Sequence, residues 1–175
     1  MKDFLELAGQ RYSERYFDAN RDIEKDKLDK ILEAGRIAPT AANFQPQKIY
    51  VLKSTEALEK AAALTHTFQA AVVLLVCYDI DTVWKNPGDR MFKEYNAGEQ
   101  DASIVAASMM FEAEDLGVHS IWIRGFDAQS VADEFDLPEN IKPVMMLALG
   151  YPGTDSKPAP MHTTRKALSE TVEEL

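Results

Sequence analysis

Two arginines and a serine near the start of the chain have the types and the spacing of an anion-binding segment. The stretch RYSERYF, residues 11–17, places Ser13 between Arg11 and Arg15. Guanidinium groups donate paired hydrogen bonds to two oxygen atoms of a phosphate, and a serine hydroxyl adds a further donor. These residues therefore predict a phosphate site. The competing interpretation is a charged, solvated surface just after a short helix.

The overall charge makes a local group of cations informative. The chain of 175 residues has 19 Lys and Arg against 29 Asp and Glu, which gives a formal net charge of −10. Such a surface repels nucleic acids and anionic membranes, so neither is expected as a partner. A phosphate group would bind only where a few cations gather.

A second polar segment, APTAANFQPQ at 38–47, follows a predicted helix. Its small residues would let a ligand approach the backbone closely. A well-formed loop with its amides facing water is equally compatible with the pattern. The polar side chains that offer donors and acceptors to a planar heterocycle are Thr40, Asn43, Gln45 and Gln47.

Two shorter segments are ordinary when taken alone. In WIRGFD, 122–127, a strand runs into Gly125 and an N-cap aspartate, so backbone N–H groups could face a ligand. A common strand-to-helix turn is the favoured interpretation of that stretch. Arg165 and Lys166 follow near the C-terminal end and would by themselves be a solvated pair.

Other catalytic chemistries lack their sequence patterns. The three histidines have no metal-ligand spacing, and Cys77 lies in an apolar run without a basic neighbour. Neither a G-x-G-x-x-G motif nor a P-loop motif occurs, and G-x-S-x-G is absent. We therefore expect no metal site, no catalytic thiol and no nucleotide binding through those glycine-rich loops.

Hydrophobic periodicity predicts the elements that must position these residues. Because strands and helices do not alternate strictly, the predicted class is α+β, in a single domain over 1–175. No apolar run approaches the roughly 20 residues of a membrane span, no secretory signal is evident, and the expected location is the cytoplasm. The predicted helices cover 3–9, 23–38, 54–65, 97–117 and 127–135, and the predicted strands cover 48–53, 71–78, 119–123 and 142–152.

Three segments fit poorly into the core of one small chain. The predicted helix 97–117 is apolar around nearly its whole circumference from 104 to 111, so it should be buried on all sides, as a dimer interface would allow. The polar loop 79–96 is long enough to be functional or mobile. The tail 151–175 contains Pro158 and Pro160 after the last predicted strand and is expected to run over the surface or around a partner.

Taken in order, these segments resemble the nitroreductase-like, FMN-dependent oxidoreductases. The resemblance covers essentially the whole chain: R-x-S-x-R, then A-P-[ST]-x-x-N-x-Q-P, then DLGVHSIWI, GFD and LGYP, and a basic pair before LSETV. It implies a nitroreductase-like α+β fold with a central mixed or antiparallel sheet flanked by helices. It also implies an intertwined homodimer whose active sites lie between the subunits, with the tail packed on the partner.

The resemblance implies roles for single residues in binding FMN. The phosphate would be held by Arg11 and Ser13, beside Tyr12, and completed by Arg165 and Lys166. The second subunit would approach the cofactor with a group of loop residues, namely Pro39, Thr40, Ala41, Asn43 and Gln45.

Further residues are implied around the flavin ring. Arg15 would lie near its pyrimidine edge and Gln69 near the ring or the ribityl chain. The N5 side would be lined by Ile123, Arg124 and Gly125.

The implied activity is reduction of nitroaromatics, quinones or similar flat electrophiles, with NAD(P)H as electron donor and ping-pong kinetics. No side chain is assigned as a catalytic residue. Trp84, Phe92 and Tyr95 of the 79–96 loop are candidate walls of the substrate pocket, with plain loop packing as the alternative for each. Two other functions stay open: a flavin enzyme of the same fold with other reductive chemistry, such as dehalogenation, and a non-enzymatic flavin-binding or regulatory protein.

Overall fold

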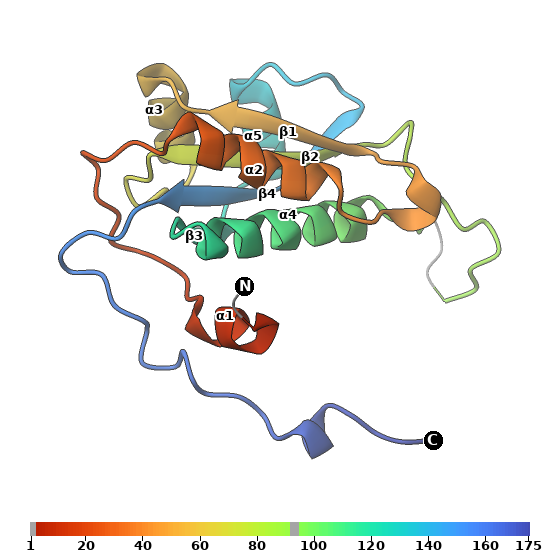
Figure 1. The fold of residues 1–175 in the computed structure, drawn as a ribbon. Coiled ribbons are helices and arrows are strands. Elements are labelled where there is room, and N and C mark those ends of the chain that lie inside the picture. Colours follow the sequence, from red (N-terminus) through yellow and green to blue (C-terminus); the bar gives the residue numbers. More distant parts are fainter. Residues whose placement is uncertain (1–2, 92–94) are drawn as a thin grey trace.

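The computed structural model describes residues 3–91 and 95–175 (Figure 1). The α+β class is confirmed, and each predicted helix and strand begins and ends within two residues of an observed one. The helices are α1 (Phe4–Gln10), α2 (Lys25–Arg36), α3 (Thr55–Leu64), α4 (Gly98–Asp115) and α5 (Ala128–Glu134), with short 3-10 turns η1 (Ala41–Asn43) and η2 (Leu168–Glu170). The strands are β1 (Gln47–Leu52), β2 (Val72–Asp79), β3 (His119–Ile123) and β4 (Ile141–Gly150).

The four strands form one sheet in the order β1-β2-β4-β3, and every neighbouring pair is antiparallel. The sheet is thus antiparallel, one of the two arrangements expected. Strand β2 is central and covered on both faces, which explains why it is a continuous apolar run instead of an alternating one. Its residues 72 to 78 are all buried.

Helices cover both faces of the sheet (Figure 1). Even-numbered side chains of β2 pack with α2 and α4, while odd-numbered ones pack with α3 and α5. This is the two-residue alternation of a strand. Two of these helices begin at capping residues: Ser54 accepts a hydrogen bond from Ala57 N at 3.2 Å, and Asp127, the N-cap expected from the sequence, accepts one from Ser130 N at 2.8 Å.

The single chain does not bury α4 on all sides. The sheet and α2 cover one side of the helix, and α1 adds an edge-to-face contact between Phe4 and Phe111 with ring centroids 5.1 Å apart. Ile104 nevertheless remains 43% exposed. One chain therefore leaves part of this helix uncovered, as expected, and its coverage by a dimer interface stays a prediction.

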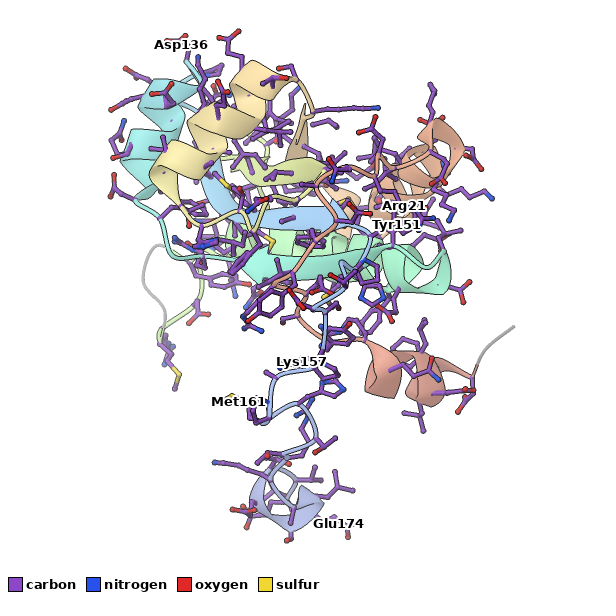
Figure 2. All side chains as sticks on the ribbon, turned by 90° about the vertical axis from the view of Figure 1, so that its left-hand side faces the viewer. Arg21, Asp136, Tyr151, Lys157, Met161 and Glu174 are labelled. Atoms are coloured by element: carbon purple, nitrogen blue, oxygen red, sulfur yellow. The ribbon has the colours of Figure 1, made fainter. Side chains whose placement is uncertain are left out.

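The C-terminal segment leaves the body of the molecule after β4. Figure 2 shows Lys157, Met161 and Glu174 at increasing distance from the sheet. Large apolar side chains of this segment face away from any core, and Met161 is 73% and Leu168 79% exposed. The expectation that the tail is not core is confirmed from Gly153 onward, whereas Tyr151 is 3% exposed and belongs to the core.

The described residues between β2 and α4 form a loop, as expected, with a bridge between Lys85 and Asn96. Trp84 packs against the core and makes an edge-to-face contact with Tyr95, with ring centroids 6.2 Å apart. Phe92 lies outside the described residues. None of the described helices has the length and apolar character needed to span a bilayer.

Candidate functional site

The 11–17 segment runs beside the edge strand β3. Ser13 forms a parallel bridge with Ser120, and Glu14 N donates to Ser120 O at 3.0 Å. Arg11 and Ser13 are half-buried, and Arg15 is exposed with its Nη1 donating to Ser13 O at 3.1 Å. The segment is therefore joined to the edge of the sheet by an isolated bridge, with its two arginines on either side of Ser13.

A groove of about 800 Å³ brings Arg15 and Gln69 together. Its walls come from the 15–20 segment, the loop between α3 and β2, and the first residues of the tail, 152–155. Gln69 was predicted from the resemblance alone. Among the predicted site residues, it shares this groove with Arg15.

The loop that carries Gln69 has an unusual backbone. Phe68 and Gln69 have φ values of 57° and 58°, a left-handed conformation that non-glycine residues seldom adopt. The loop is held by Phe68 N, which donates to His66 Nδ1 at 3.2 Å. Thr65 Oγ1 donates to Gly125 O at 3.1 Å, so the predicted turn after β3 adjoins the same loop.

The neighbours of Gly125 point in different directions. The Ile123 side chain is buried in the core on the side of α3 and α5, so its backbone, not its side chain, is left to face a ligand. Arg124 is exposed, with its guanidinium 5.4 Å from the Phe126 ring centroid.

The 38–47 loop is the second place where the backbone is strained. Ala42, Asn43 and Gln45 have φ values of 48°, 59° and 52°. Such conformations persist only where their surroundings fix them, and they gather at ligand-binding sites. Here Gln45 N donates to Thr40 Oγ1 at 3.0 Å, and Pro39 at the start of the loop is exposed.

Asp101, which the sequence gives as an ordinary acid in the first turn of a helix, anchors this loop. Its carboxylate is 2% exposed, and Oδ1 accepts a hydrogen bond from Ala41 N at 2.8 Å. Oδ2 is buried and has no hydrogen-bond partner among the described residues. The sequence places Asp101 directly before Ala102 at the start of the apolar helix. That position alone does not predict that the Asp101 carboxylate is buried.

One chain does not assemble all the predicted residues. The 38–47 loop and the 11–17 segment lie at opposite ends of α2 (Figure 1). This helix has 12 residues and is therefore about 18 Å long. The tail contacts α1 through His162, whose Nε2 lies 3.0 Å from Gly9 O. Within the described residues, Arg165 instead donates to His162 O and Thr164 O, and Lys166 is exposed.

Tyr12 is half-buried and Cys77 is fully buried, and each is held in its neutral form. Burial, with a smaller effect from the Glu14 carboxylate, raises the pKa of Tyr12. Burial in β2 raises the pKa of Cys77 to about 12, which is the reverse of what an activated thiol needs. Across residues 3–91 and 95–175, no three His, Cys, Asp or Glu side chains are placed to hold a metal ion.

Comparisons with known proteins agree with this architecture. A solved nitroreductase family protein from Clostridium difficile 630 is 38% identical, with a TM-score of 0.90 and 98% of each chain covered. A relative from Methanothermobacter thermautotrophicus, provisionally named NADH dehydrogenase/NAD(P)H nitroreductase, is 28% identical over 159 residues, which are 86% of this chain and 78% of the relative.

A protein from Exiguobacterium sibiricum 255-15, solved in complex with FMN, has the same fold at 22% identity and a TM-score of 0.81, with 100% of this chain and 98% of that chain covered. The model of the nitroreductase family matches residues 8–72 and 59–151. The chain belongs to the nitroreductase family.

Proposed function

We propose that the protein is an FMN-dependent NAD(P)H oxidoreductase that reduces nitroaromatics, quinones or similar flat electrophiles by a ping-pong mechanism. The observation that carries the proposal is the groove joining Arg15 to the strained loop of Gln69. A cation and an amide from distant parts of the chain meet there, in a protein whose net charge is −10.

The residues present fit the chemistry of FMN. A phosphate needs guanidinium and hydroxyl donors, which Arg11 and Ser13 supply from one segment. The flavin ring needs amide donors and acceptors at its polar edge and close approach of backbone on its faces. Gln69 and the loop of Asn43 and Gln45 offer both, on backbone fixed in conformations typical of ligand-binding sites.

Each of these side chains has a separate task in the proposed reaction. When bound, FMN supplies hydride transfer from NAD(P)H and electron transfer to the acceptor. Arg11 and Ser13, with Arg165 and Lys166, bind the phosphate. Arg15 places a positive charge at the pyrimidine edge, where it favours the reduced, more negative cofactor. Orientation and electrostatics are thus the contribution of the chain, and no acid or base of its own is required.

The proposed enzyme is a homodimer with two shared sites. The length of α2 keeps the 39–45 residues away from the groove of their own chain, so a second copy has to supply them (Figure 1). The exposed Ile104 of α4 and the apolar side chains of the tail offer surface for that contact. The 151–175 tail would pack on the partner, and the 79–96 loop would border the substrate.

An anaerobic titration tests this function. Purified protein is loaded with FMN and mixed with NADH or NADPH, and the visible absorbance of the flavin is followed. We expect one nucleotide to bleach it and a quinone or nitroaromatic to restore it. A protein that binds FMN but is reduced by neither nucleotide would be a non-enzymatic flavin-binding protein. Re-oxidation by a halogenated aromatic alone would indicate dehalogenation, and failure to bind FMN would refute the proposal.

A further inference from the structure

A fully buried carboxylate lies within the segment that carries the predicted phosphate ligands. Glu14 stands between Ser13 and Arg15, yet its side chain is 0% exposed. Charged side chains are almost never fully buried unless other groups compensate them. The surroundings of Glu14 therefore indicate what the carboxylate does.

Four hydrogen bonds hold the Glu14 carboxylate. Oε1 accepts from the backbone N–H groups of Arg15 and Tyr16, both at 2.8 Å. Oε2 accepts from Tyr12 OH at 3.2 Å and from Ser156 Oγ. Oε1 thus accepts from the backbone of its own segment, and Oε2 accepts from a neighbouring tyrosine hydroxyl and from the start of the tail.

His119 faces the same carboxylate from β3. Its Nδ1 lies 3.3 Å from Glu14 Oε2, near enough for charge attraction but not aligned as a hydrogen bond. The Tyr12 ring packs edge-on against the imidazole, with centroids 5.1 Å apart. His119 thus places a polar ring atom of β3 beside the buried carboxylate.

The backbone contacts of Glu14 connect this cluster to the predicted cofactor ligands. Glu14 is buried and holds the N–H groups of residues 15 and 16, while the Arg15 side chain is exposed and Arg11 and Ser13 are half-buried. Turning the backbone at Arg15 or Tyr16 would break the bonds to Oε1 and re-aim the side chains of this segment.

We propose that Glu14 is a positioning residue for the phosphate of the cofactor. It fixes the backbone at residues 15 and 16, and through Ser156 it fixes the start of the tail that carries Arg165 and Lys166. One carboxylate thereby sets both segments from which phosphate ligands are drawn. This inference rests on the proposed binding of FMN.

The test compares FMN with riboflavin, which has the same ring but no phosphate. Dissociation constants are measured by flavin fluorescence for the wild type, Glu14→Ala, Glu14→Gln and the control Glu139→Ala, whose side chain is exposed. We expect Glu14→Ala to weaken FMN binding about tenfold or more, the effect of losing a well-aimed charged hydrogen bond. Riboflavin affinity should fall by a smaller factor, because Arg15, which Glu14 also holds, is placed at the ring and not at the phosphate. Glu14→Gln should recover most of the loss, because its amide oxygen still accepts both backbone N–H groups.

A second readout needs no flavin. In the wild-type apoprotein the amide protons of Arg15 and Tyr16 should exchange slowly with solvent, and in Glu14→Ala they should exchange faster. If Glu14→Ala does not fold, the double variant Tyr12→Phe with Ser156→Ala removes both hydroxyl donors to Oε2 and should give a smaller loss specific to FMN.

The outcomes separate this inference from the proposed function. An unchanged ratio of FMN to riboflavin affinity in Glu14→Ala, or in the double variant where that one replaces it, would overturn the positioning role. Equal losses for both flavins would overturn it as well, since they would indicate general damage. A wild-type protein that binds neither flavin would refute the proposed function instead, while the amide exchange would still report whether Glu14 holds the segment.

Discussion

The Asp101 carboxylate joins the 38–47 loop to the central helix α4 through a single hydrogen bond to Ala41 N. Asp101→Ala leaves that N–H without its partner, which costs about 1–3 kcal/mol for a buried group. We expect the free energy of unfolding, measured in urea at one protein concentration, to fall by that amount. Glu99→Ala changes an exposed acid in the same helical turn and should alter stability by no more than about 0.5 kcal/mol. Equal effects would contradict the anchoring role.

The Cys77 thiol shows how burial alone removes a chemistry that the residue type permits. Because burial raises its pKa to about 12, the thiol stays protonated at pH 8, and a disulfide reagent that attacks thiolates should not label the native protein. Unfolding should return the thiol to its ordinary pKa and allow complete labelling. As a positive control, Glu139→Cys in a Cys77→Ala background should react rapidly while folded. Stoichiometric labelling of native Cys77 would contradict its burial.

At the scale of elements, backbone conformation distinguishes the 38–47 loop from an ordinary surface turn. Ala42 has a φ of 48°, which a side chain disfavours and glycine does not. Ala42→Gly should therefore raise the free energy of unfolding, by up to about 1 kcal/mol. The same substitution within α2, Ala34→Gly, should lower it by about 1 kcal/mol, since glycine is a poor helix former. If both variants lowered the free energy of unfolding measured in urea, the positive φ at Ala42 would not be a disfavoured conformation.

The sequence predicts the limits of helices and strands well, but it predicts poorly the strained loop at Ala42 and the burial of Glu14. The two outcomes have separate physical reasons. Helix and strand limits follow from periodicity and N-caps such as Ser54, which are local. The strain at Ala42 has no local signal, because no glycine marks it, and the loop is held at the preceding residue, Ala41, by Asp101, sixty residues away. Glu14 in RYSERYF has the composition of a solvated surface, and its burial depends on groups contributed by β3 and the tail.

At the scale of the whole molecule, the single chain leaves apolar surface in places that a monomer would be expected to cover. Phe4, Leu5, Met161 and Leu168 are between 59% and 79% exposed, and they belong to the two ends of the chain. In Figure 1, α1 and the tail extend from the same side of the body. A second copy would cover such surface. In the proposed function, that copy would also supply the 38–47 loop to a site that begins at the 11–17 segment.

A site shared between two copies can be tested by mixing two defective variants. One carries Arg11→Ala with Ser13→Ala and lacks phosphate ligands. The other carries Asn43→Gly with Gln45→Gly, which removes both amides while glycine suits their positive φ. In a twofold-symmetric dimer, each site would combine the first segment of one protomer with the 39–45 loop of the other. A heterodimer of the variants then has one site with both defects and one site with none.

The stoichiometry of FMN binding after joint refolding decides between the two arrangements. Random pairing makes half of the dimers heterodimers, so a shared site should restore FMN binding at about one quarter of all sites. Each variant refolded alone should bind FMN weakly. If every site were built within one chain, both sites of the heterodimer would keep a defect, and mixing would restore nothing. Bound FMN per protomer, counted by absorbance after gel filtration, therefore distinguishes a dimer that completes its sites from one that merely associates.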